Sequence, residues 1–179
     1  LDGCGRQTWK INDLGWFDIT EYPELDTVEI WRFINDSGVS HPMHMHLVFF
    51  QVLDRDTFTK DGNGQIIPDG NPQPPPAHED GWKDTVMVDP GEIVRVIARF
   101  EGYKGMYPYH CHILEHEDHE MMRQFEVVLP PQFTGIQKAG TNILLQYQPT
   151  PHYLHYLQRR DDLFSGAWFT FTNGIPASN

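Results

Sequence analysis

The stretch DTVMVDPGEIVRVIARF, residues 84–100, contains two strand-like segments on either side of one tight turn. Its β-branched and aromatic side chains alternate in part with polar ones over 84–89 and again over 93–100, which is typical of strands with one buried face. The residues between them, DPG at 89–91, are turn material. Two strands joined in this way favour a fold built from short β-strands.

Similar segments lie on both sides of this stretch, at 27–35 (TVEIWRFIN), 47–56 (LVFFQVLDRD) and 125–128 (FEVV). No long amphipathic helix is evident before residue 150. Many short strands separated by turns predict an all-β sandwich or barrel.

The domain organisation follows from length and from two consecutive prolines. A chain of 179 residues fits one domain of ordinary size and one small further piece. Pro130 and Pro131, directly after Leu129, cannot donate to a strand ladder, so we expect the main domain to span residues 1–131. Residues 132–179 are then a C-terminal extension of unknown role, which we expect to dock on that domain.

The extension has its own pattern. Residues 150–166, TPHYLHYLQRRDDLFSG, predict a short helix with Thr150 as its N-cap and Gly166 past its end. AWFTFTN at 167–173 predicts a strand. Within the main domain, residues 56–81 are rich in Gly, Pro and Asp and predict a long surface loop, either a solvated connection or a lid over a substrate pocket.

Charge and hydropathy argue against two classes of partner. Acidic residues outnumber basic ones 25 to 13, and the formal charge of −12 repels phosphate backbones and anionic membranes. The longest strongly apolar stretch, residues 47–53, is far shorter than the roughly 20 residues of a membrane span. We therefore expect no nucleic acid and no membrane as partner. The first residues, LDGCGRQ, show no initiator Met or targeting signal, so we interpret the chain as a fragment or a processed product.

Histidines gather in two windows, and the first is HPMHMH at 41–46. Side chains alternate between the two faces of an extended chain. His44 and His46 should therefore share one face, and His41 should point to the other.

The second window is HCHILEHEDH at 110–119, followed closely by Met121. The same alternation places His110 and His112 on one face and Cys111 on the other. Each window thus offers one ligand to one side and two imidazoles to the other, which predicts two metal sites.

The first predicted site combines His41, Cys111, His116 and Met121. Two imidazoles, one thiolate and a weak axial thioether are the ligands of blue copper, which transfers electrons. Zinc is the rival metal because Cys and His also build zinc sites, but a Met thioether is a poor zinc ligand. The second predicted site consists of His44, His46, His110 and His112. Such a set of imidazoles suits copper ions that are exposed to a small ligand such as oxygen. A single HxH pair could instead be two surface or capped histidines.

Three motifs carry a family resemblance: HPMHMHL at 41–47, GWKDTV at 81–86 and HCHILEHEDHEMM at 110–122. Together with WKIND at 9–13, they resemble the last cupredoxin domain of multicopper oxidases, especially relatives of spore-coat laccase, bilirubin oxidase and phenoxazinone synthase. The resemblance covers about residues 8–128. It implies a Greek-key cupredoxin fold, copper as cofactor, and an extracytoplasmic or spore-surface location.

The resemblance also implies the role of each ligand. His41, Cys111, His116 and Met121 would hold the type 1 copper, His44 the type 2 copper, and the type 3 pair would be held by His46, His110 and His112. Glu117 stands where related bacterial enzymes place a carboxylate that assists proton delivery. In its acidic surroundings, the alternative is a carboxylate that simply faces solvent.

The remaining candidates receive no catalytic role. His119 would lie on the rim of the first site, and the other histidines outside the windows are read as surface or structural residues: His78, His152 and His155. Cys4 could pair with Cys111, but a disulfide would remove the thiolate that copper requires. We therefore expect a free or intermolecular Cys4.

The resemblance assigns to this chain only half of the imidazoles of a complete trinuclear copper cluster, and the sequence holds no further HxH pair. We expect the C-terminal part of a longer laccase-like oxidase. A phenol, aromatic amine or bilin-like donor would give single electrons to the type 1 copper, and they would pass through Cys111 to His110 and His112 and reduce O2 to water. The missing ligands would come from an N-terminal cupredoxin domain of the same enzyme or from another subunit. The alternatives are an isolated blue-copper electron carrier without oxidase activity and self-assembly of two copies.

Overall fold

The computed structural model describes residues 8–162, 165–170 and 175–176. The chain divides into two compact units, one ending at Val127 and the other beginning at Val128. The expected helix after Thr150 lies in the second unit and the histidine windows lie in the first.

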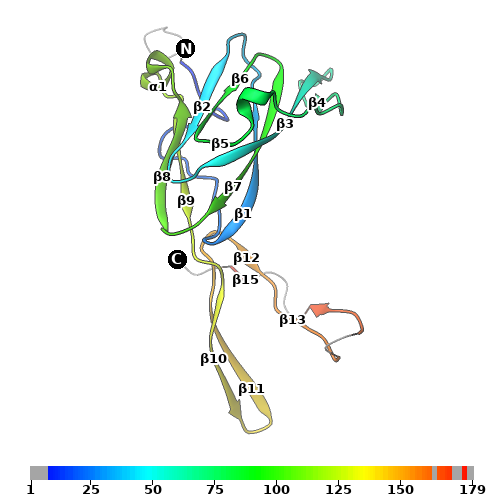
Figure 1. The fold of residues 1–179 in the computed structure, drawn as a ribbon. Helices are drawn as coiled ribbons and strands as arrows, with labels where there is room; N and C mark the ends of the chain where they lie inside the picture. Colours follow the sequence, from blue (N-terminus) through cyan, green and yellow to red (C-terminus); the bar gives the residue numbers. More distant parts are fainter. Residues whose placement is uncertain (1–7, 163–164, 171–174, 177–179) are drawn as a thin grey trace. The chain divides into compact units, whose positions relative to one another are not determined.

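Two antiparallel sheets form the first unit (Figure 1). The strands of the first sheet, in spatial order, are β1 (Thr27–Ile34), β7 (Glu92–Phe100), β3 (Phe50–Lys60) and β4 (Ile66–Pro68), with β5 (Trp82–Lys83) also paired to β3. Those of the second sheet are β6 (Thr85–Val88), β2 (His41–Met45), β8 (Gly105–Cys111) and β9 (Met122–Val127). The predicted all-β fold is confirmed.

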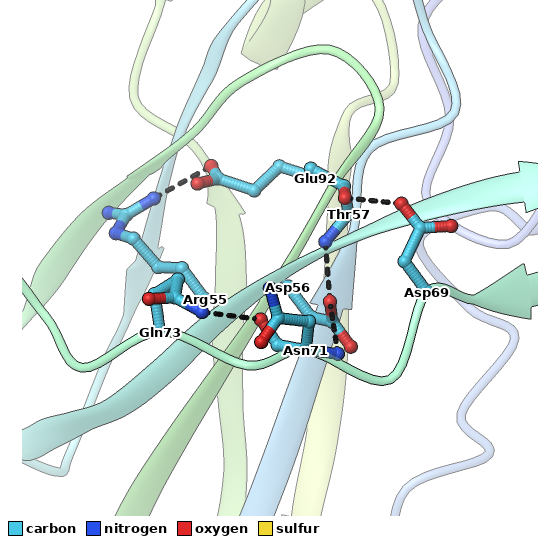
Figure 2. A pocket seen from close by; sticks show the side chains of 7 residues that line it. All are labelled: Arg55, Asp56, Thr57, Asp69, Asn71, Gln73 and Glu92. Carbon is cyan, nitrogen blue, oxygen red and sulfur yellow. Dashed lines mark hydrogen bonds and ion pairs between the residues drawn. The ribbon is translucent and has the colours of Figure 1, made fainter.

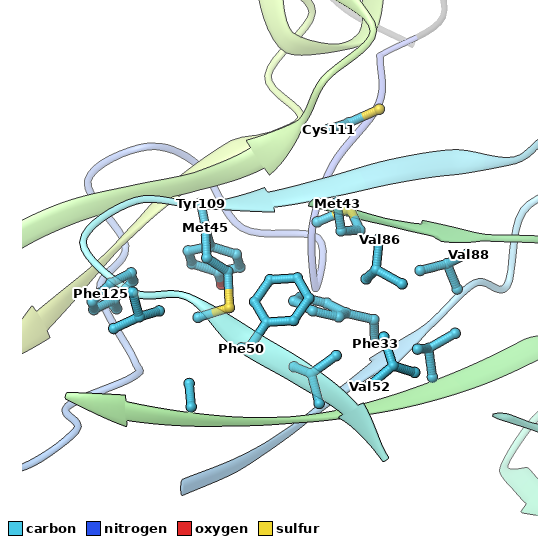
Figure 3. Close-up of a cluster of buried hydrophobic side chains, with 14 of the residues drawn as sticks. Phe33, Met43, Met45, Phe50, Val52, Val86, Val88, Tyr109, Cys111 and Phe125 are labelled. Carbon is cyan, nitrogen blue, oxygen red and sulfur yellow. The ribbon is translucent and has the colours of Figure 1, made fainter. Parts of the chain in front are cut away.

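Side chains from both sheets meet in one apolar core (Figure 3). The strands alternate as predicted: along β2, residues His41, Met43 and Met45 are buried while Pro42 and His44 are less so. Phe50 of the first sheet and Phe125 of the second are fully buried. Burying each such side chain contributes about 1.5–3 kcal/mol, so the core holds the sheet ends that carry the histidines in fixed positions.

The stretch predicted as one long surface loop, residues 56–81, instead contains the end of β3, β4 and a short 3-10 helix. β3 continues to Lys60 and pairs with β4, and Arg55 and Gln73 exchange two backbone hydrogen bonds. The Arg55 guanidinium binds Glu79 of the 3-10 helix η1 (Ala77–Glu79) and Glu92 of β7, with N to O distances of 2.6–2.8 Å. Figure 2 shows a polar pocket beside this stretch. The side chains that line the pocket bind one another, and no histidine is among them.

The second unit contains short antiparallel pairs. β10 (Gln132–Ala139) pairs with β11 (Asn142–Gln148), β12 (Leu154–His155) with β15 (Ile175–Pro176), and β13 (Gln158–Arg159) with β14 (Phe169–Thr170). The strand predicted at 167–173 is seen at Phe169–Thr170, and residues 171–174 are outside the described part of the chain.

The helix predicted over residues 150–166 was wrong, since its described residues form the strands β12 and β13 instead. A helix of this length is marginal in water without an apolar face to bury. Asp161 and Asp162 would also stand at its C-terminal end, where the helix dipole disfavours negative charge. Among the described residues, the α-helix is α1 (Leu114–Asp118) of the first unit, and no helix there is long and apolar enough to cross a membrane.

Candidate metal centres

The first donor group lies where the start of β2 meets the end of β8. The register places Met43 opposite Cys111, so His41 lies close to the Cys111 side chain. The Cys111 Sγ is 3.5 Å from His41 Nδ1 and 3.5 Å from His116 Nδ1, and the two nitrogens are 3.2 Å apart. Cys111 is completely buried and His41 is 3% exposed. Three donor atoms thus converge on one point inside the domain.

The helix α1 brings the third donor to this point. His116 lies on α1, directly after β8, and its carbonyl accepts the backbone N–H of Met121. The Met121 carbonyl in turn accepts the N–H of Cys111 at 3.0 Å. These two hydrogen bonds close the segment from Cys111 to Met121 into a loop that carries Cys111, His116 and Met121. The Met121 side chain is 8% exposed and belongs to the same buried cluster as Cys111.

A polar network fixes the tautomer of His41. Its Nε2 lies 2.8 Å from Ser37 Oγ, whose single proton faces two competing acceptors, Asn35 Oδ1 at 2.7 Å and Val39 O at 3.1 Å. Ser37 Oγ must therefore accept from His41 Nε2–H, which leaves the Nδ1 lone pair free toward the sulfur. Asn35 is itself held, because its amide donates to Val39 O and Val88 O.

Burial sets the protonation of the first group. Burial, and after it the neighbouring His116, lower the pKa of His41 to about 4. Burial also lowers the pKa of His116 and raises the pKa of the Cys111 thiol. Near pH 7 the imidazoles are neutral and can donate their lone pairs, whereas the thiol keeps its proton until a metal displaces it.

The second donor group lies on the opposite face of β2 and β8. One ring nitrogen from each of His44, His46 and His110 lies within 4.8 Å of the others, and the Nε2 atoms of His46 and His110 are 3.4 Å apart. His112 lies beside them, with its ring centroid 5.4 Å from that of His44 and 5.6 Å from that of His110. The four imidazoles thus gather as predicted, with His112 on the edge of the group. Burial and the neighbouring His44 and His110 lower the pKa of His46.

Backbone carbonyls orient two of these rings. His44 Nδ1 donates to Asp84 O at 2.8 Å, and His110 Nδ1 donates to Cys111 O at 3.1 Å. A carbonyl can only accept, so both rings carry their proton on Nδ1 and present Nε2 as the ligand atom. Asp84 belongs to GWKDTV at 81–86, one of the motifs of the family resemblance, and this motif therefore orients a predicted ligand.

Glu117 faces the second group. Its Oε2 lies 3.2 Å from His110 Nδ1, and its side chain is 27% exposed. His116 and Glu117 are consecutive on α1, yet His116 lies in the first donor group and Glu117 lies against the second. This carboxylate therefore touches both a candidate ligand and solvent.

The other histidines belong to neither donor group. His119 follows α1 and offers its carbonyl to the backbone N–H of Trp9. His78 is on η1, His152 and His155 are in the second unit, and Cys4 lies outside the described residues. Sequence reasoning missed Asn35, Ser37 and Trp9 as neighbours of the first group, because their contacts depend on long-range packing.

The donor chemistry of both groups fits copper. One buried sulfur and two neutral imidazoles form a set that accommodates either oxidation state of copper, and an imidazole cluster suits copper that binds a small ligand. The two groups are also directly joined, since Cys111 belongs to one and His110 to the other. Adjacent residues of one strand therefore connect both groups through covalent bonds.

Comparisons with known proteins point to the same chemistry. The sequence profile described as multicopper oxidase matches residues 10–130. Laccase from Bacillus subtilis is 44% identical over 72% of this chain and 26% of its own length, and bilirubin oxidase from Albifimbria verrucaria is 36% identical over 70% and 21%. The crystal structure of the multicopper oxidase McoA from Aquifex aeolicus superposes with a TM-score of 0.53, at 33% identity over 66% of this chain and 26% of that one.

The chain spans about a quarter of the length of these relatives. The matched residues contain both donor groups, which are the groups that could hold copper. The matched profile covers more than half of the chain and includes both donor groups, and the chain belongs to the multicopper oxidase family.

Proposed function

We propose that this chain is the C-terminal copper-binding part of a laccase-like oxidase that oxidises small aromatic donors and reduces O2 to water. The observation that carries the proposal is the direct covalent connection between a buried thiol group and an imidazole cluster, through Cys111 and His110. Such a connection serves a protein that accepts electrons at one place and uses them at another.

The role of each ligand is the one that the family resemblance implies for the residues of the two donor groups. His41, Cys111, His116 and Met121 would hold the type 1 copper. His44 would hold the type 2 copper, and the type 3 pair would be held by His46, His110 and His112. Copper bound at these sites supplies one-electron redox chemistry, from an organic donor to dioxygen.

The protein's own groups prepare this chemistry. Ser37 keeps His41 in the tautomer that presents Nδ1, and Asp84 O does the equivalent for His44 Nε2. Burial keeps water from the Cys111 sulfur. Glu117 lies 3.2 Å from His110 Nδ1 and reaches solvent, so it is placed to hold and pass the protons that oxygen reduction consumes.

The imidazole cluster needs a second contributor. We propose that an N-terminal cupredoxin domain, in the same enzyme or in another subunit, supplies the remaining ligands, in line with the much greater length of the relatives. The discriminating experiment loads the purified chain with copper and follows the blue absorption and O2 uptake with a phenolic donor. The same assay is then run on the chain joined to the segment encoded immediately upstream.

We expect a blue band from the chain alone and O2 uptake only with the upstream segment. A blue chain that stays without oxidase activity in both forms would identify an electron carrier instead. O2 uptake by the chain alone, at a rate rising with the square of its concentration, would indicate self-assembly. A chain that never turns blue would contradict the proposal.

Replacing Met121 with leucine should keep the copper and raise its reduction potential. The loss of a weak axial thioether destabilises the oxidised ion, and we expect a rise on the order of 59 mV, a tenfold change for a one-electron couple. Redox titration of the blue band measures it. Met87→Leu is the control, because Met87 lies on β6 with 44% of its side chain exposed. Equal potentials for both variants would exclude Met121 as the axial ligand.

A further inference from the structure

An indole ring lies against both imidazoles of the first donor group. The centroid of Trp9 is 4.4 Å from that of His116, with the planes tilted by 35°, and 5.3 Å from that of His41 in an edge-to-face arrangement. Aromatic rings at these separations attract one another and restrict each other's rotation. Trp9 therefore limits the orientations of two rings whose nitrogens face the Cys111 sulfur.

The backbone around Trp9 is tied to the helix that carries His116. The N–H of Trp9 donates to the carbonyl of His119 at 3.0 Å, and His119 is the C-cap residue directly after α1. Lys10 also forms an ion pair of 3.0 Å with Glu120, although both side chains are substantially exposed and the pair is weak. The backbone that carries the indole is thus hydrogen-bonded to the chain three residues after His116.

The segment that carries Trp9 is anchored a second time. The fully buried Arg123 of β9 binds Asp18 O, Thr20 Oγ1 and Glu21 Oε1. Both ends of residues 8–21 are therefore attached to the second sheet or its loop. Trp9 itself is partly buried and packs on the core cluster. An indole held at both ends of its segment cannot move away from the imidazoles without breaking these bonds.

We propose that Trp9 is a positioning residue of the type 1 site, which fixes the His116 ring and excludes water from the face of the donor group that it covers. This inference rests on the assignment of the first group as a copper site. Its consequence is that the ligand set at the sulfur stays free of an added water, which would otherwise change the coordination of copper.

The test uses the full chain loaded with copper and needs no oxidase activity. Trp9→Leu keeps an apolar side chain but removes the flat ring, whereas Trp9→Phe keeps an aromatic ring. Trp16→Ala is the matched control, because Trp16 lies on the same segment and no ring contact to either imidazole is found for it among the described residues. Copper(I) affinity is measured by competition with a chelator, and copper(II) by the thiolate charge-transfer bands and the electron paramagnetic resonance spectrum.

We expect Trp9→Leu to lose about 10–100-fold in copper affinity, the range seen when the outer-shell support of a metal ligand is removed. Its spectrum should shift toward that of a site with an added oxygen ligand. Trp9→Phe should recover most of the wild-type spectrum, and Trp16→Ala should equal the wild type. Thermal unfolding of the metal-free variants checks their fold, and Trp9→Ile replaces Trp9→Leu should the latter not fold.

Wild-type affinity and spectrum in folded Trp9→Leu or Trp9→Ile would overturn the proposal. So would a spectral change of equal size in Trp9→Phe and Trp9→Leu, since the aromatic ring would then have no specific effect. A wild-type chain that shows no thiolate charge-transfer band is a different result, because it refutes the copper assignment itself together with the role of Trp9.

Discussion

Replacing Cys111 with serine should abolish the blue absorption of the copper-loaded chain. The colour of such a site arises from charge transfer between a thiolate and copper(II), and a serine hydroxyl is a harder donor that keeps its proton near neutral pH. The Cys111 sulfur is completely buried and lies 3.5 Å from a nitrogen of each neighbouring imidazole. Within the described residues it is the thiol through which both imidazoles can share a metal.

The matched control is Cys4→Ser, which changes the other cysteine of the sequence. It should leave the blue band unchanged. Total copper must be measured beside the spectrum, because the imidazoles of the second group can retain copper in Cys111→Ser. An intense blue band that survives in Cys111→Ser would refute the ligand assignment. Loss of the band in both variants would instead indicate that the thiols act together.

The proton released on copper binding gives an independent reading of the same residue. Burial raises the pKa of the Cys111 thiol, so copper must displace its proton near neutral pH. The Cys111 thiol has a higher pKa in the metal-free protein than an exposed thiol. Because copper and the proton compete for its sulfur, copper uptake should weaken as pH falls. Cys111→Ser should lose this proton release at the first site.

Much of the candidate site could be predicted because it depends on one short-range property, the alternation of side chains along a strand. His41 and Cys111 point into the domain, and His44 and His110 point to the opposite face, as the two histidine windows predicted. Three strands were predictable from their apolar patterns, since β1, β6 and β7 coincide closely with the segments singled out. β3 begins three residues later than its predicted segment and continues to Lys60, into the stretch predicted as a loop.

The support of the site could not be predicted, because it depends on which distant segments pack together. The Asp84 carbonyl reaches His44 through the pairing of β2 with β6, in which His44 lies opposite Thr85. Trp9 reaches His116 only because its segment crosses the end of α1. One sequence gives no direct information on such long-range registers.

The helix predicted near the C-terminus failed for a different reason, because local signals were present but long-range pairing outweighed them. Local signals at Thr150 and Gly166 favoured a helix, but the described residues between them pair as short strands with residues further along the chain. Capping signals contribute only about 1 kcal/mol, so pairing with another segment can outweigh them. The carbonyl of Thr150 is used instead to accept a hydrogen bond from His155.

Replacing Arg123 with methionine should strongly destabilise the first unit. Arg123 is fully buried on the inner face of β9, where its guanidinium binds Glu21 Oε1 at 3.0 Å and the Tyr109 hydroxyl at 2.8 Å. Burial, and after it Glu21, raise the pKa of Tyr109, so this hydroxyl stays neutral and Glu21 supplies the charge that Arg123 balances. Methionine would fill a similar volume but leave that carboxylate without its cation.

Removing one partner of a buried ion pair costs about 3–5 kcal/mol, and because the Glu21 side chain is 24% exposed we expect the lower end of this range and a fall of roughly 10 °C in the Tm of the metal-free chain. Lys10→Met is the control, since Lys10 and Glu120 are 36% and 56% exposed and their ion pair should contribute at most about 1 kcal/mol.

The double variant Arg123→Met with Glu21→Gln separates charge from packing. It removes the unpaired carboxylate as well, so it should be more stable than Arg123→Met alone if the cost is electrostatic. Equal destabilisation of the single and double variants would mean that Arg123 acts through packing and its bonds to Asp18 O and Thr20 Oγ1. A Tm of Arg123→Met within the range of the Lys10→Met control would contradict both accounts, because a fully buried guanidinium that binds four groups would then contribute no more than an exposed ion pair.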